Sequence, residues 1–150
     1  LAEAQRRTEE RLEQLAEVTS RLASQVGGLS DTVGFGLEDV ARVMVPGWLE
    51  KHLGVSVEGE LEPAYIDRKV QVNLLGRGRR VSGEEVVVVG ECKSRIHSSD
   101  VKSFLRVVEA AKRAFEGKDV LGFMFGYLVY PNAGEEAEKH GVIVLAPYRK

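Results

Sequence analysis

Hydrophobic residues recur with a seven-residue period over the first 30 positions of the chain. Leu1, Thr8, Leu15, Leu22 and Leu29 occupy one heptad position, and Gln5, Leu12, Thr19 and Val26 occupy the other. This period predicts a coiled-coil helix that joins two copies of the chain as a homodimer. An amphipathic helix can also pack on its own domain, and the pattern alone leaves that alternative open.

Beyond the heptads, the Gly-Phe-Gly run at 34–36 predicts a domain boundary near residue 33. We therefore expect a coiled-coil helix at 1–33 and a second domain at 34–150. A helical stripe runs from Leu37 to Leu53, with Pro46-Gly47 inside it, where a kink or a restart is expected.

The rest of the pattern alternates between strand and helix periods. Strands are predicted at 55–61, 69–75, 85–92, 120–130 and 142–145, and helices from Ser98 or Ser99 to 116 and at 133–140. The first three strands form an antiparallel meander, with a turn at 76–80. This succession predicts an α/β (α+β) fold with a mixed central sheet and helices on its faces.

Composition narrows the class of protein. The 150 residues carry a net charge of -2, so any nucleic-acid binding must rest on a local cluster of positive charge. The single cysteine, Cys92, excludes an internal disulfide and favours a reducing, cytoplasmic setting. The sequence contains no stretch of about 18 apolar residues, so it predicts neither a membrane span nor a membrane partner. Because the chain begins with Leu1, we expect it to be a fragment of a longer protein.

The residues with the clearest chemistry end the most apolar strand. Val86 to Gly90 is followed by Glu91-Cys92-Lys93, and residues two apart in a strand project from the same face. Burying two charges there costs free energy, so their presence indicates that they have a role. Glu91 and the Cys92 carbonyl could bind magnesium, while Lys93 could orient the attacking water and neutralise a phosphate. The alternative is an ion pair without chemistry.

With these residues in place, the chain resembles the PD-(D/E)xK nuclease superfamily from residue 34 to about 146. Val-Gly-Glu-Cys-Lys-Ser at 89–94 matches the second motif of that superfamily. Glu38 matches a glutamate that some members, including archaeal Holliday-junction resolvases, add to the site. Prokaryotic proteins that join a coiled coil to such a domain look similar over the whole layout. The resemblance implies a restriction-endonuclease-like αβββαβαβ core and a magnesium- or manganese-dependent endonuclease acting on DNA, with Lys93, Glu91 and Glu38 as catalytic residues.

One position departs from the superfamily pattern. The first acidic residue should lie on the second strand, where this chain has Asn73, and Asp67 is expected in the preceding turn. The Asn73 carbonyl oxygen could still bind a metal, but the lost charge should weaken binding or abolish it. Asn73 could instead satisfy neighbouring backbone groups, and Glu38 could be a helix-terminus acid. A catalytically inactive nuclease-fold module that binds DNA or protein is therefore the second functional hypothesis, and a purely structural coiled-coil protein is the third.

Positive charges are predicted to surround this site. The candidate contacts to the phosphates of duplex or branched DNA are Arg77, Arg79 and Arg80 in the turn, together with Arg68, Lys69, Arg95, His97, Lys102 and Arg106. The alternative is a solvated hairpin tip and helix face.

Overall fold

The computed structural model describes residues 2–25 and 30–149, with side chains described for 2–15 and 36–147. The elements in chain order are α1 (Ala2–Gln25), α2 (Ser30–Leu53), β1 (Val55–Ile66), β2 (Val70–Arg80), β3 (Glu85–Ile96), α3 (Ser98–Ala114), β4 (Asp119–Val129), α4 (Pro131–Lys139), β5 (Ile143–Leu145) and β6 (Tyr148–Arg149). The predicted succession of one helix, three strands, and then alternating helices and strands is confirmed, with β6 as an addition.

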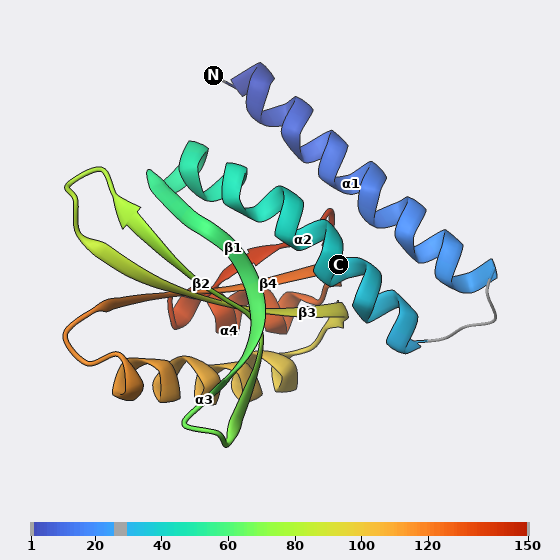
Figure 1. Cartoon of the computed structure of the whole chain (residues 1–150). Helices are drawn as coiled ribbons and strands as arrows, with labels where there is room; N and C mark the ends of the chain where they lie inside the picture. Colours follow the sequence, from blue (N-terminus) through green and yellow to red (C-terminus); the bar gives the residue numbers. More distant parts are fainter. Residues whose placement is uncertain (1, 26–29, 150) are drawn as a thin grey trace.

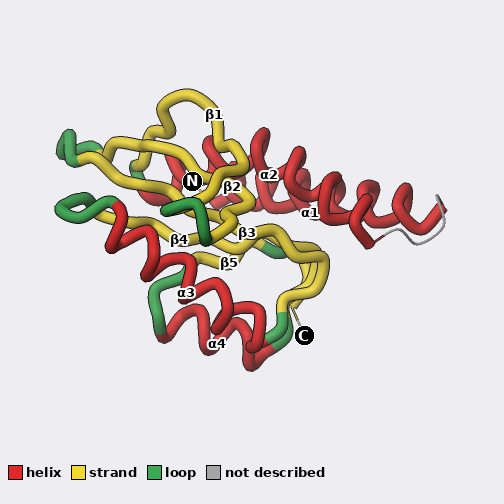
Figure 2. The backbone as a smooth tube through the Cα atoms, turned by 60° about the horizontal axis from the view of Figure 1, so that its bottom comes forward, coloured by secondary structure: helices red, strands yellow, loops and turns green. Residues whose placement is uncertain are grey.

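The described strands form a single mixed sheet in the order β1-β2-β3-β4-β5, with β6 pairing on β4. β1, β2 and β3 are antiparallel, whereas β3, β4 and β5 are parallel. Parallel neighbours need a crossover connection, and α3 supplies it between β3 and β4. Figure 1 shows α1 and α2 on one face of the sheet and α3 and α4 on the other, and Figure 2 shows the sheet between these helical layers. The predicted α+β fold with a mixed sheet is therefore confirmed.

β3 lies at the centre of this sandwich and is buried on both faces. Val88 and Cys92 pack into the core beneath α2, and Val87 and Val89 pack into the core beneath α3. A strand covered on both faces needs apolar residues at odd and even positions alike, which explains the run of valines. α2 contributes a buried residue at every fourth position, at Leu37, Ala41, Val45 and Leu49.

Three local predictions are wrong. The Gly-Phe-Gly run at 34–36 lies inside α2 rather than before it, and the helix does not restart at Pro46, where a kink stays a prediction. Arg77, Arg79 and Arg80 lie within β2, so the turn falls at 81–84. Asp67 does lie in the turn between β1 and β2, as predicted. None of the helices in the described residues is long and apolar enough to cross a membrane.

α1 packs against its own chain. Leu12 is 7% exposed and belongs to the core beneath α2, and the Lys51 Nζ donates a hydrogen bond of 3.5 Å to the Thr8 hydroxyl. The heptad positions Leu1, Val26 and Leu29, and the side chains of Thr19 and Leu22, lie outside the described residues. Docking of the helix on its own domain thus uses part of the heptad stripe, and self-association through the coiled coil stays a prediction.

Truncating Leu12 distinguishes the two uses of this helix. We expect Leu12→Ala to lower the free energy of unfolding by about 2 kcal/mol, because a buried side chain is lost from the core. Leu15→Ala is the control, since Leu15 is 41% exposed, and it should cost less than about 1 kcal/mol. Urea unfolding measures both. Equal losses, together with a midpoint that rises with protein concentration, would instead favour the coiled-coil dimer.

Candidate functional site at the end of β3

Glu91 and Lys93 project from the face of β3 that α3 covers. Glu91 is half-buried and Lys93 is exposed, and they alternate in register with the buried Val87 and Val89. Burial raises the pKa of Glu91, the charge of Lys93 lowers it, and the carboxylate of Asp100 raises it. Burial dominates, so the Glu91 carboxyl keeps its proton to a higher pH than a solvated glutamate does.

Asn73 lies directly beside this triplet, where the pairing of β2 with β3 ends. The last pair in the ladder is Leu74 with Gly90. On the other side of β2, Asn73 and Leu74 together oppose Pro63 of β1, which is a β-bulge. Beyond the last pair, the Asn73 Oδ1 accepts a hydrogen bond of 3.0 Å from the Cys92 backbone N–H. Asn73 therefore satisfies a backbone donor that the interrupted ladder leaves unpaired, and its role as a metal ligand stays a prediction.

Cys92 faces the opposite side of β3 from Glu91. Its side chain is 7% exposed and packs beneath α2. Burial raises the pKa of the thiol, and the negative charges of Glu38 and Glu91 raise it further. The thiol is thus kept protonated and unreactive. Glu38, on α2, lies close enough for its negative charge to raise the pKa of this thiol. Glu38 is therefore on the α2 side of β3, whereas Glu91 is on the α3 side.

The sequence analysis missed Asp100, in the first turn of α3. Its Oδ2 accepts a hydrogen bond of 2.8 Å from the backbone N–H of His97, which is the N-cap residue of the helix. The predicted caps, Ser98 and Ser99, were therefore one and two residues late. An acidic residue three positions after the cap is a sequence signal that could have located this end of the helix. The same carboxylate raises the pKa of Glu91, so the start of α3 borders the site.

The donor atoms at the end of β3 fit a weak divalent-metal site. Glu91 offers a carboxylate and Cys92 a backbone carbonyl, whereas the Asn73 oxygen already accepts one hydrogen bond. Among the described side chains, no group of three or more His, Cys, Asp and Glu is placed to hold a metal ion. Magnesium binds through one or two carboxylates and keeps several waters, so these three oxygen donors are of a suitable type. They carry only one negative charge between them, which makes the site weak.

The arginines at the end of β2 lie away from the triplet, contrary to expectation. Arg79 pairs with Glu85, the first residue of β3, and Glu91 is about 20 Å further along that strand at about 3.3 Å per residue. Arg79 bonds to Glu58 at 2.8 Å and to Glu85 at 3.2 Å, and Arg80 bonds to Asp119 at 2.6 Å. Lys118 and then Arg79 lower the pKa of Glu85. Arg79 and Arg80 are therefore neutralised by neighbouring carboxylates.

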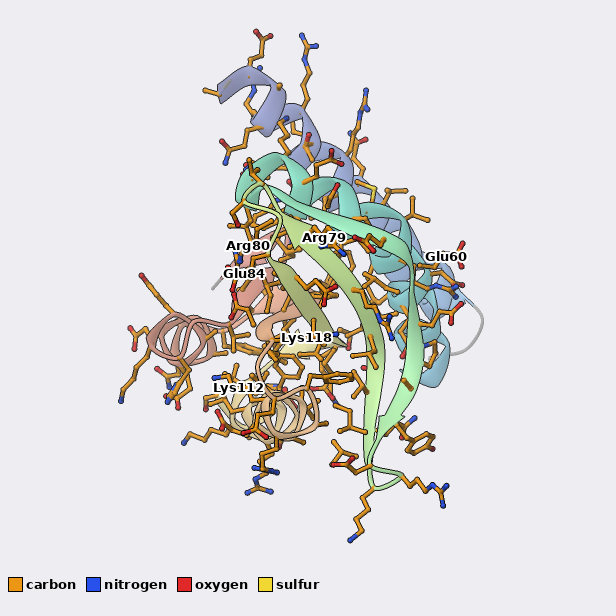
Figure 3. All side chains as sticks on the ribbon, turned by 60° about the vertical axis from the view of Figure 1, so that its left-hand side comes forward. Glu60, Arg79, Arg80, Glu84, Lys112 and Lys118 are labelled. Carbon is orange, nitrogen blue, oxygen red and sulfur yellow. The ribbon has the colours of Figure 1, made fainter. Side chains whose placement is uncertain are left out.

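A cavity of ≈ 430 Å³ opens at this distant end of the sheet. Its wall includes Arg77, Arg79, Glu58, Glu85 and Lys118, so positive and negative charges are mixed. Figure 3 looks onto this side of the molecule, with Arg79 and Lys118 labelled. Of the predicted nucleic-acid contacts, Arg95 and Lys102 are exposed. Arg95 lies two residues after Lys93 on β3, and both side chains are exposed.

The chain is thus an α+β protein with a glutamate and a lysine at the end of its central strand. A family model described as "Domain of unknown function (DUF8196)" matches residues 39–150, and the chain belongs to that family. No curated protein matches the chain.

The solved structures that are similar to it include three chains. One is a repair endonuclease from Pyrococcus abyssi, with a TM-score of 0.46 and 20% identity over 68% of this chain and 44% of that one. The second is EndoMS in a complex with double-stranded DNA, with a TM-score of 0.44 and 21% identity over 68% of this chain and 42% of that one. The third is apo EndoMS, with a TM-score of 0.39 and 21% identity over 70% and 45% of the two chains. The chain spans less than half the length of these structures.

Proposed function

We propose that the end of β3 is a nuclease-like site of the PD-(D/E)xK type that acts on phosphodiester bonds of DNA. The observation that carries the proposal is the shared placement of Glu91 and Lys93 on one face of β3, next to Asn73. A half-buried carboxylate and an exposed ammonium at the open end of a strand suit a phosphate that approaches from solvent.

Each residue then has a distinct role. Lys93 would neutralise charge that builds on the phosphate and would orient the attacking water, since its ammonium is exposed and bears three donors. Glu91, the Cys92 carbonyl and Asn73 would hold magnesium or manganese, which when bound activates water and polarises the phosphate. Glu38 would assist from α2, and Arg95 and Lys102 would contact flanking phosphates.

A second function is favoured by a specific contact. The Asn73 oxygen is used to bind the Cys92 N–H, as a structural side chain would be, and asparagine brings no charge to a metal. A non-catalytic module that binds DNA through the same surface is therefore the alternative proposal. It shares Lys93 and Arg95 with the nuclease but needs no metal.

The deciding experiment combines binding and cleavage. Linear, nicked, branched and single-stranded DNA would be incubated with excess protein in magnesium, in manganese and in EDTA. We expect metal-dependent cleavage that falls at least about 100-fold in Lys93→Met and in Glu91→Gln, because each variant removes a group that acts in the transition state. Lys112→Met is the matched control, because Lys112 lies on α3 and pairs with Glu109 at 3.5 Å.

The other outcomes separate the two proposals. DNA that is bound but stays intact in both metals would select the non-catalytic module. Protein that neither binds nor cleaves any of the four DNA forms at low salt would overturn both, since phosphate contacts are strongest there.

A further inference from the structure

The closed end of the β1–β2 hairpin carries two unpaired cations. The hairpin continues past the last β2–β3 pair, Leu74 with Gly90, and its closed end projects next to α3 in Figures 1 and 3. Arg68 and Lys69 are exposed there, and neither side chain has a hydrogen bond or an ion pair within the described residues. Arg79 and Arg80, by contrast, are both bound to carboxylates.

The backbone of this turn is unfavourable for the residues it contains. Asp67 and Arg68 have φ angles of 52° and 62°, and the Lys69 N–H donates to the Ile66 carbonyl at 3.1 Å. Two successive positive φ angles define a type I′ turn, which prefers Asn or Asp followed by glycine. Arginine at the second position is strained by its Cβ. A turn that keeps arginine where glycine would be more stable suggests that the side chain has a use.

The turn is also held firmly in place. Ile66 and Val70 form the pair that closes the hairpin, and Ile66 is 3% exposed in the core beneath α3. Tyr65, next to Ile66, is 65% exposed. The cations are thus presented on a fixed base, which reduces the ordering cost of binding a ligand.

The tip lies within reach of a ligand at the candidate site. Asn73 contacts the triplet, and Lys69 is four residues before it on the same hairpin, which is about 13 Å at about 3.3 Å per residue. Phosphates follow one another along a DNA strand at a rise of about 3.4 Å, so this distance spans about four nucleotides.

We propose that Arg68, supported by Lys69, contacts the phosphate backbone of DNA whose scissile or central phosphate lies at the end of β3. This inference rests on the proposed function, because it takes DNA as the ligand. It adds the hairpin tip to Arg95 and Lys102 as a flanking phosphate contact, in place of Arg79 and Arg80, which are bound to carboxylates.

Substitutions at the turn separate stability from affinity. Arg68→Gly creates the preferred Asp-Gly pair, so we expect the melting temperature to rise by about 2–4 °C while DNA binding weakens. Arg68→Gln removes the charge but keeps the strained backbone, so it should weaken binding without raising the melting temperature. Asp67→Asn keeps Arg68 and removes a negative charge, so binding should stay equal or become tighter.

Affinity would be measured by fluorescence anisotropy with a labelled 20-bp duplex in EDTA, over a range of salt concentrations. We expect Arg68→Gly and Arg68→Gln to reduce the slope of log affinity against log salt by about one, as the loss of one phosphate contact predicts. If the unaltered protein binds the duplex and both variants keep its affinity and slope, the role of the hairpin is wrong and the proposed function stands. If the unaltered protein does not bind this duplex, the hairpin contact is overturned, whereas the proposed function fails only if none of the four DNA forms is bound or cleaved at low salt.

Discussion

Gly126→Ala is expected to lower the free energy of unfolding by about 3 kcal/mol, one of the largest effects of any single substitution near the site. Gly126 on β4 pairs with Lys93 on β3, and a Cβ added to it would lie 2.3 Å from the Lys93 carbonyl oxygen and 2.8 Å from Ile96 Cδ1. A backbone carbonyl in the middle of a parallel ladder cannot rotate away as a side-chain end can. Relief therefore requires the two strands to separate, and Lys93 moves with β3.

Gly134→Ala is the matched control for this effect. Gly134 lies inside α4, and a Cβ there would meet nothing within 4 Å. Alanine is the better helix former, so this variant should gain about 0.5–1 kcal/mol. Denaturant unfolding of both variants measures the difference. A loss below about 1 kcal/mol for Gly126→Ala would show that β3 and β4 can separate at little cost, and that the geometry around Lys93 is less constrained than the contacts imply.

Asn73→Asp is expected to raise the affinity for magnesium or manganese by about tenfold, equivalent to about 1.4 kcal/mol. An aspartate oxygen can accept the Cys92 N–H as the asparagine oxygen does, so the strand end should keep its arrangement. The second oxygen then brings a negative charge beside Glu91. In the absence of metal the two carboxylates repel each other, so the variant should be less stable than the unaltered protein in EDTA and should recover stability when metal is added.

Isothermal titration calorimetry measures the affinity, and thermal unfolding with and without metal measures the linked stability. Asn132→Asp supplies the control, since Asn132 is the other asparagine of the chain and is exposed at the start of α4. It makes the same change in net charge at the start of α4, where Asn132 lies beside His97 and Ser98. Equal metal affinities in the two aspartate variants would contradict the assignment of position 73 to a metal site. Cleavage gained in Asn73→Asp, and lost again in Asn73→Asp with Lys93→Ala, would identify a degraded nuclease site.

Several elements could be predicted because their residues satisfy local rules. The valine run of β3 has apolar residues on both faces, which only a strand covered on both sides requires. The four-residue spacing of buried positions in α2 likewise fixes which face meets the sheet. Alternation along β3 placed Glu91 and Lys93 on one face before any contact was known.

Other features depend on partners that are distant in sequence. Arg80 is neutralised by Asp119, which is 39 residues away, and Arg79 is held by Glu58, 21 residues away, so the run of arginines alone could not reveal its own neutralisation. The role of Asn73 depended on a β-bulge opposite Pro63 and on the end of the β2–β3 ladder. A bulge arises from how two strands meet, and neither strand sequence specifies it.

The sequence by itself determined the order of elements, the central strand and the pair of charged residues at its end, because hydrophobic period and strand alternation are local properties. Only the tertiary structure decided that Leu12 of the heptad helix is buried against its own domain, since the same apolar stripe suits a partner helix equally well. It also decided where positive charge stays unpaired. Among the described side chains, Arg79 and Arg80 are neutralised while Arg68 and Lys69 on the hairpin tip are not, because ion pairs form between side chains that folding alone brings together.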